Sequence, residues 1–199
     1  MTQQAATTAL VIEVPEAEPV VGRHRARLDP FAAGGVPAHV TVLFPFVEIP
    51  RLVKDPLLAD DVAQRVARVV SGQPAFPYCF SRTRWFGDRV LWLAPDDPSP
   101  FVALTRALAL AFPGFEPYEG MFDDIVPHLT IGQREDPAPL REAEEDTCGR
   151  LPVRGHATDV SLLLLDSSGG WERLWTAPLG ARAGRPCTHR PNGFLSVRH

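Results

Sequence analysis

A sequence of three residues, histidine, an apolar residue and threonine, occurs twice in this chain of 199 residues. The first copy runs from His39 to Thr41 and the second from His128 to Thr130, each in a short apolar segment after a proline. Such segments predict β-strands. Because strand side chains at positions i and i+2 point to the same face, each copy presents an imidazole and a hydroxyl together.

Each copy closes a longer repeated pattern of strand, helix and strand. The pattern predicts first strands at 9–14 and 89–94, helices at 16–28 and 99–112, and motif strands at 38–44 and 125–131. Two such units related by pseudo-symmetry would bring the motif strands together at the centre of the molecule. The two histidines would then meet across a cleft.

The remaining segments also alternate between helix and strand signals. They predict helices at 57–71 and 138–148, a strand at 76–86 that turns back at Gly87-Asp88, and a hairpin of strands at 157–165 and 171–177. We expect Trp171, Arg173 and Trp175 to share one face of the last strand. The segments 29–37 and 113–124 are expected to be loops because they are rich in glycine and proline.

These elements predict one domain of the α+β class. The expected organisation is a disordered N-terminus at 1–8, a single bilobal domain at 9–179, and a disordered basic tail at 180–199. The polar N-terminus lacks the pattern of a secretory signal. We therefore expect a cytoplasmic protein.

The composition limits the classes of function. Hydrophobic residues make up 45% of the chain and charged residues 22%, as in globular proteins. No apolar run approaches the roughly 20 residues that span a membrane, and a net charge of −4 argues against coating nucleic acid by charge alone. The three cysteines form no Cys-x-x-Cys pair, so they indicate neither a disulfide framework nor a zinc ribbon. We expect a monomer without a membrane or an obligate protein partner.

Two histidines that face one substrate can divide the work of acid–base catalysis. The neutral ring accepts a proton and the protonated ring donates one, near the ordinary pKa of imidazole. The hydroxyls of Thr41 and Thr130 can donate hydrogen bonds to the oxygens of a phosphate ester. A single histidine on an apolar strand is usually structural, so this hypothesis depends on the two copies lying in matched positions.

A metal centre is a weaker interpretation of the same residues. It needs three or four ligands at suitable spacing, and the only set that can be imagined combines His39 and His128 with Asp123 or Asp124. The other histidines, such as His156, stand in no matching motif. We therefore expect neither a metal nor a cofactor.

The strings His-Val-Thr-Val-Leu-Phe-Pro-Phe and Pro-His-Leu-Thr-Ile-Gly resemble those of the 2H phosphoesterase superfamily. Within it, the chain is most similar to the bacterial 2'-5' RNA ligase or RNA 2',3'-cyclic phosphodiesterase group, over about residues 9–179. The resemblance implies a pseudo-symmetric bilobal fold. Two antiparallel sheets would form a central cleft, with the helices packed outside.

The resemblance also implies a reaction. A 2',3'-cyclic phosphate on an RNA end or a small nucleotide would be opened to a 2'-phosphate without a metal. By family analogy, His128 activates water, His39 protonates the 3' oxygen, and Thr41 and Thr130 bind the phosphoryl oxygens. The same pair in reverse would join RNA ends through a 2'-5' bond without ATP.

Three further positions are candidate substrate contacts by the same analogy. Phe44 falls where relatives often have an aromatic residue that stacks on a base, although strict strand alternation places it opposite Thr41, in the core. Some relatives have an arginine three residues after the second threonine. Here Gln133 occupies that position and Arg134 follows it.

Two other functions stay compatible with the residues. The cleft can hold a nucleotide or an RNA end without catalysis, and the lack of a basic residue directly beside either motif favours such a binding module. A 2H enzyme can also act on another phosphoester, such as an ADP-ribose cyclic phosphate or a 2'-5' oligonucleotide.

Overall fold

The computed structural model of the chain describes residues 7–47, 56–114, 125–165 and 170–180. The first strand begins at Thr7, slightly before the predicted start of the domain. The rest of the ends predicted to be disordered, residues 1–6 and 181–199, lies outside the described residues. None of the described helices is long and apolar enough to cross a membrane.

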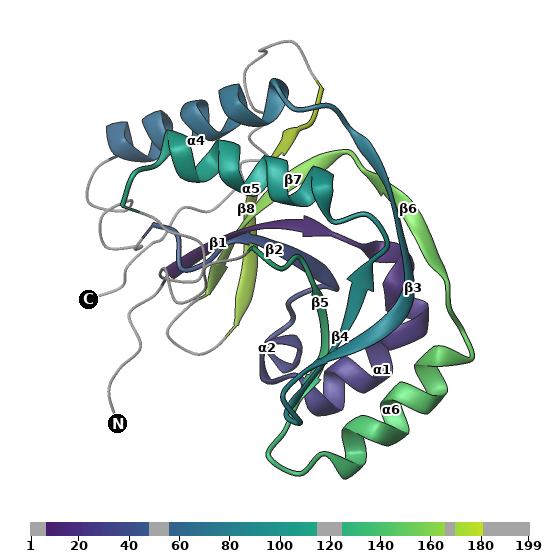
Figure 1. The fold of residues 1–199 in the computed structure, drawn as a ribbon. Coiled ribbons are helices and arrows are strands. Elements are labelled where there is room, and N and C mark those ends of the chain that lie inside the picture. The colour runs from purple at the N-terminus through teal and green to yellow at the C-terminus, as the bar shows by residue number, and fades with distance from the viewer. Residues whose placement is uncertain (1–6, 48–55, 115–124, 166–169, 181–199) are drawn as a thin grey trace, which may run out of the picture.

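The strands form two four-stranded sheets in which every neighbouring pair is antiparallel (Figure 1). The first sheet has the order β2 (His39–Leu43), β1 (Thr7–Glu13), β7 (Asp159–Leu165) and β8 (Trp171–Pro178). The second sheet has the order β5 (Leu129–Gln133), β4 (Val90–Pro95), β3 (Phe76–Phe86) and β6 (Val153–Ala157). The predicted α+β class with two antiparallel sheets is confirmed, and each motif strand is an edge strand of its sheet.

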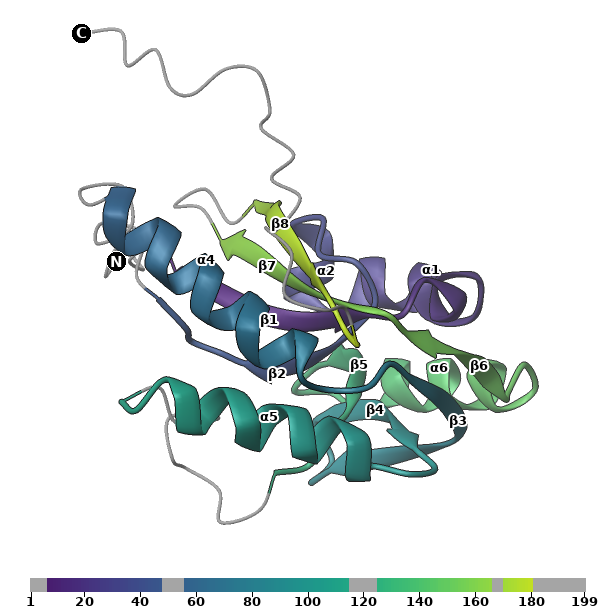
Figure 2. The ribbon, with the colours of Figure 1, turned by 90° about the horizontal axis from the view of Figure 1, so that it is seen from above.

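The four longer helices lie outside the sheets, as predicted (Figures 1 and 2). The described helices are η1 (Pro15–Ala17), α1 (Glu18–Leu28), α2 (Pro30–Ala33), α4 (Pro56–Ser71), α5 (Ser99–Ala111) and α6 (Ala138–Cys148). Helices α4 and α5 pack on the first sheet, and α1 and α6 pack on the second. In α4 the valines at 62, 66 and 70 are buried, which is the spacing of one helix face.

The two repeats exchange their helices. Helix α1 lies between β1 and β2 in the chain but packs against β5, whereas α5 lies between β4 and β5 but packs against β2. The motif strands β2 and β5 also contact each other, and Figure 2 shows them between α5 and α1. Each repeat therefore supports the motif strand of the other repeat, and the two halves share one apolar core.

A β-bulge in β2 redirects the residues that follow the first motif. Val11 lies opposite Thr41 and Leu10 lies opposite Leu43, so β2 has one extra residue between these pairs. As a result Leu43 turns into the core, while Phe44 returns to the face of Thr41 and packs beside Val11. The prediction from strict alternation, that Phe44 faces away from the motif side chains, is wrong for this reason.

The same device occurs after the second motif. Trp92 lies opposite Thr130 and Leu91 lies opposite Gly132, so β5 also has one extra residue. Its effect is to bring Gln133 back to the face of Thr130. In both strands, the residue three positions beyond the threonine shares the face of the motif, which we call the motif face of each sheet.

A glycine in β5 allows the close approach of the helices behind the second sheet. A Cβ atom on Gly132 would lie 2.6 Å from Leu28 Cβ of α1 and 2.8 Å from Leu140 Cδ2 of α6. Both distances are shorter than carbon atoms tolerate. Any side chain at this position would therefore push α1 and α6 away from the second motif strand.

Two elements were not predicted. Strand β6 contains His156 and alternates buried and exposed residues, which the polar sequence Arg154-Gly-His156 obscured. Helix α2 lies in the segment predicted as a loop, and its first turn is capped by Asp29, whose Oδ1 accepts from Phe31 N at 3.0 Å. Strand β5 also begins later than predicted, so His128 stands one residue before it.

The prediction for the face of β8 is wrong for one residue. Trp175 lies opposite Leu162 and Arg173 lies opposite Leu163, so a bulge separates the two. Trp175 packs on the main core with Leu162, while Trp171 packs with Leu163 on the motif face.

Candidate active site

The ring of His39 is held by a backbone carbonyl two residues upstream. Its Nδ1 atom lies 2.7 Å from the carbonyl oxygen of Pro37. A carbonyl only accepts, so Nδ1 carries the hydrogen and donates it. This bond fixes the tautomer and the orientation of the ring, and it assigns any exchange of protons with a substrate to Nε2.

His128 has the same arrangement in the second lobe. Its Nδ1 donates to the carbonyl oxygen of Val126 at 2.8 Å, again two residues upstream. The Trp92 ring lies 5.8 Å from the His128 ring, between centroids, which places His128 on the motif face with Thr130. The duplicated motif therefore produces two imidazoles in the same tautomer. His39 is the first residue of β2, and His128 stands one residue before β5.

The pKa of both imidazoles is lowered. Burial is the main cause for His39, and the positive charges of Arg25 and His128 add to it, so the pKa falls to about 4 although the Pro37 carbonyl and Glu13 act in the opposite direction. Burial also lowers the pKa of His128. The influence of His128 on His39 shows that the two rings lie within electrostatic range of each other.

The two motif threonines are half-buried and share the motif faces of the sheets. Thr41 lies opposite Val11 and Thr130 lies opposite Trp92. Neither hydroxyl bonds to another residue within the described parts of the chain. Each is thus placed to donate to a bound anion near its histidine.

A buried arginine of α1 connects the two motifs. Arg25 is only 2% exposed, and its Nε donates to the carbonyl oxygen of Thr130 at 3.1 Å. Its Nη1 donates to the carbonyl oxygen of Val36 at 3.3 Å, just before the first motif, and its Nη2 donates to Asp29 Oδ2 at 3.1 Å. One guanidinium therefore binds a backbone carbonyl at the edge of β5 and a second backbone carbonyl just before β2.

The network continues to the residue before His39. Glu18 Oε1 lies 3.5 Å from Arg25 Nη1 and accepts from the backbone N–H of Ala38 at 2.5 Å. Sequence reasoning missed Arg25, because nothing distinguishes it from the neighbouring arginines of the same helix. The spacing Arg25-x-x-x-Asp29 was the only local signal, and it indicates no more than a helical ion pair.

The candidate substrate contacts divide into two groups. Phe44 and Gln133 lie on the motif faces, through the bulges of β2 and β5. Arg134 does not join them, because its guanidinium donates to the backbone carbonyl of Arg27 in α1, behind the second sheet.

Two arginines that were not predicted as substrate contacts occupy the motif faces. Arg84 of β3 lies opposite Trp92 and is exposed. Arg173 of β8 donates through Nη2 to Glu13 Oε2 at 2.5 Å, and Glu13 lies opposite His39. Cationic groups near the motifs thus come from neighbouring strands rather than from the motif strands.

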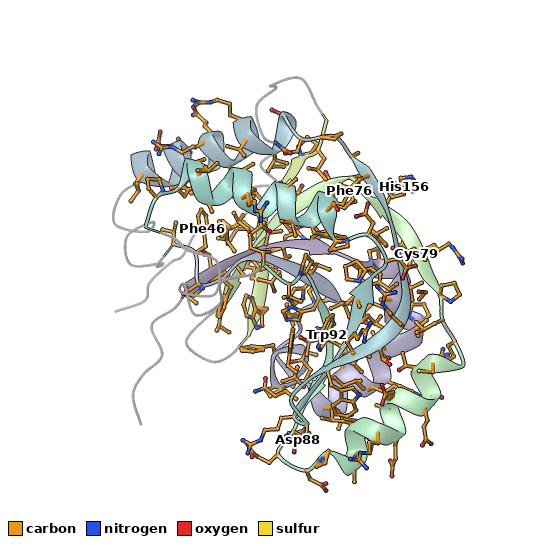
Figure 3. The ribbon with its side chains drawn as sticks, viewed as in Figure 1. Phe46, Phe76, Cys79, Asp88, Trp92 and His156 are labelled. Carbon is orange, nitrogen blue, oxygen red and sulfur yellow. The ribbon has the colours of Figure 1, made fainter. Side chains whose placement is uncertain are left out.

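The remaining histidines are not gathered at the motifs. His156 lies at the outer edge of the second sheet, whereas Trp92 lies toward the centre (Figure 3). His24 Nε2 lies 2.8 Å from Asp146 Oδ2, between α1 and α6. Within the described ranges, no three His, Cys, Asp or Glu side chains are grouped as metal ligands, and Asp123 and Asp124 lie outside the described residues.

This arrangement, with a histidine and a threonine on the motif face at each of two adjoining edge strands, is the one that the paired motif predicts for a two-histidine phosphoesterase. Residues 13–169 match the model of the 2'-5' RNA ligase superfamily, which is most of the chain. The protein belongs to this superfamily.

Solved structures share the fold at low sequence identity. Escherichia coli LigT complexed with 3'-AMP is 17% identical, with a TM-score of 0.57 over 89% of this chain and 100% of that chain. TT0787 of Thermus thermophilus is 21% identical, with a TM-score of 0.58 over 88% and 98% of the two chains. A structure described as a phosphoesterase is 18% identical, with a TM-score of 0.51 over 88% and 99%. No curated protein matches the chain significantly.

Proposed function

We propose that the protein is a metal-independent phosphodiesterase that opens 2',3'-cyclic phosphates on RNA ends or nucleotides to 2'-phosphates. One observation carries the proposal: each of two adjoining strands supplies an imidazole whose Nδ1 bonds the carbonyl two residues upstream. Two rings fixed in the same tautomer are suited to act through Nε2 on one phosphate. The family and the fold support phosphoester chemistry of this kind.

We assign His39 as the general base and His128 as the general acid. With a pKa of about 4, His39 is neutral at neutral pH, and protonated His128 is one cause of that low value. Water attacks phosphorus while His39 accepts its proton, the bond from phosphorus to O3' breaks, and His128 donates a proton to O3'. This assignment reverses the one that family analogy implies.

The bound phosphate takes part in the protonation of the site. Its negative charge raises the pKa of a neighbouring imidazole, which opposes the burial that lowers the pKa of His128. Thr41 and Thr130 would donate to the non-bridging oxygens and stabilise the charge that develops there. With an RNA 5'-hydroxyl in place of water, the same steps form a 2'-5' bond without a cofactor: the hydroxyl oxygen attacks phosphorus, His39 accepts its proton, and O3' leaves with the proton of His128.

The comparison with solved structures supports small nucleotides as ligands. LigT of Escherichia coli has been crystallised with 3'-AMP, NADP+ and ATP, and this chain shares its fold. We therefore propose RNA ends and small nucleotides as the substrate class.

The proposal is tested by hydrolysis of adenosine 2',3'-cyclic phosphate, and of a short RNA with that terminus, in the presence of EDTA. We expect a 2'-phosphate product and a loss of roughly 10²–10⁴-fold in turnover for His39→Ala and for His128→Ala. Wild-type turnover in either variant would remove the two-histidine mechanism. Nucleotide binding without turnover, for this substrate and for a 2'-5' oligonucleotide, would favour a binding module instead.

A further inference from the structure

We propose that Phe86, stacked on Trp92, is the platform for the nucleobase of the nucleotide whose phosphate reacts. This inference rests on the proposed function and adds a base-binding site beside His128. Both aromatic residues belong to strands outside the two motifs, at the end of β3 and in β4.

The three rings form one compact group. The Phe86 and Trp92 rings are stacked, with centroids 4.6 Å apart and planes inclined by 22°. The edge of the group meets His128, whose ring centroid lies 5.0 Å from that of Phe86 at an angle of 88°. A base that extends this stack would therefore attach to a sugar close to the imidazole that acts on the phosphate.

Phe86 is unusually exposed for such a residue. It is 39% exposed, whereas Trp92 is 8% exposed, so Trp92 is the buried support and Phe86 the accessible surface. An exposed phenylalanine next to a catalytic imidazole offers a flat apolar area that water solvates poorly. Every nucleobase has a π-face that can cover such a ring.

Two polar features on the same motif face fit a nucleotide. Arg84 lies opposite Trp92 and is exposed, so it can meet the negative backbone of an RNA end. The indole Nε1 of Trp92 is buried, and no residue in the described parts of the chain accepts its hydrogen. Such a donor is costly to leave unpaired.

The assigned roles of the histidines determine which nucleoside lies beside Phe86. His128 donates its proton to O3', which belongs to the nucleoside that carries the cyclic phosphate. That nucleoside therefore lies on the His128 side, next to Phe86. The aromatic group of Phe44, Phe31 and Trp171 lies on the motif face of the other sheet, on the side from which water or a 5'-hydroxyl attacks.

The test uses a pair of ligands that differ only in the base. Binding of adenosine 2'-phosphate and of methyl riboside 2'-phosphate is measured by calorimetry for wild type, Phe86→Ala, Phe86→Tyr and Phe44→Ala. We expect Phe86→Ala to weaken the adenosine ligand by roughly 5- to 150-fold, the usual worth of stacking one base. The ligand without a base should bind equally to wild type and Phe86→Ala, and Phe86→Tyr should retain the wild-type affinities.

The outcomes separate this inference from the proposed function, because binding is measured without turnover. Equal weakening of both ligands in Phe86→Ala would mean that Phe86 only supports the fold, and the inference would be wrong. It would also be wrong if Phe44→Ala, rather than Phe86→Ala, removed the contribution of the base. In turnover of adenosine 2',3'-cyclic phosphate, Phe86→Ala should raise KM and leave kcat nearly unchanged.

Discussion

The two motif strands share a backbone design but differ in their neighbours. Both β2 and β5 have a bulge after the threonine, and both histidines donate Nδ1–H to a carbonyl two residues upstream. On the first sheet, Glu13 lies opposite His39, and Arg25 lowers the pKa of that ring. On the second sheet, His128 contacts the rings of Trp92 and Phe86.

A duplicated unit can therefore provide two histidines with unlike surroundings. The repeated motif fixes the tautomer and the position of each ring. The surroundings, which are not repeated, influence the pKa of each ring. Because α1 and α5 are exchanged between the halves, each motif strand packs against a helix of the other repeat. We therefore expect a substitution in the contacts between the two repeats to affect both motifs. A substitution in the residues beside one motif should affect that motif alone.

The largest effect on stability is expected where the two motifs are joined. Arg25→Met leaves Asp29 buried without its cation, and we expect a loss of about 3–5 kcal/mol in the free energy of unfolding. Arg150→Met is the matched control, because Arg150 also donates to α1 carbonyls, those of Pro19 and Val20, but has no hydrogen bond to either motif among the described residues and is partly exposed. Denaturant unfolding measures both. A loss no larger than that of the control would contradict the role of Arg25.

Acid stability should distinguish the two histidines. The folded pKa of His39 is about 4 and the ordinary value is 6.5, so below pH 6.5 the unfolded chain takes up the proton first. Above pH 6.5 the ring contributes no pH dependence; between pH 6.5 and 4 it costs the fold up to about 3 kcal/mol. His39→Gln should remove this loss, and His128→Gln should remove a smaller one. Identical unfolding curves against pH for wild type and His39→Gln would show that His39 titrates normally.

The two threonines should contribute alike, since their positions are equivalent. Thr41→Ala and Thr130→Ala should each lower kcat/KM roughly 10- to 10²-fold, as expected for one hydrogen bond to a charged group. The corresponding serine variants keep the hydroxyl and should stay within a few-fold of wild type. If the double alanine variant hydrolyses the cyclic phosphate at the wild-type rate, the threonines do not bind the phosphate.

The smallest effect is expected at Gln133. The two bulges place this residue on one motif face and Phe44 at the equivalent position of the other. Gln133→Arg adds a cation to the motif face of β5, and we expect KM to fall by roughly 5-fold at low salt, the scale of an exposed charge pair. Added salt should reduce the gain. Arg134→Ala should leave KM unchanged, because Arg134 is directed to α1. An unchanged KM in Gln133→Arg would show that this position does not meet the substrate.

The sequence predicted the parts of the fold that depend on local patterns. The repeated strand–helix–strand units are confirmed, because periodicity and turn residues belong to short segments; the two antiparallel sheets, which the family resemblance implied, are confirmed as well. Strand β6 escaped because its exposed residues are polar and its buried ones few. Helix α2 escaped because it is only four residues long.

The features of the candidate site that could not be predicted depend on pairing between distant segments. A shift of one residue in pairing leaves no local mark, so the bulges that turn Phe44 and Gln133 to the motif faces were invisible. The role of Arg25 depends on α1 lying against β5, which is a contact between the two repeats. The stacking of Phe86 on Trp92 beside His128 brings together three separate segments of the chain.

The division of the two histidines into one base and one acid is tested most directly by comparing two leaving groups. The activated ester thymidine 3'-(p-nitrophenyl phosphate) releases p-nitrophenolate, which needs no protonation, whereas the cyclic phosphate releases a ribose hydroxyl that does. We expect the turnover of His128→Ala to fall less than about 10-fold on the activated ester but at least ~10²-fold on the cyclic phosphate. His39→Ala should lose at least ~10² on both. Equal losses for the two variants on the activated ester, or recovery of His39→Ala alone, would contradict the division into one base and one acid.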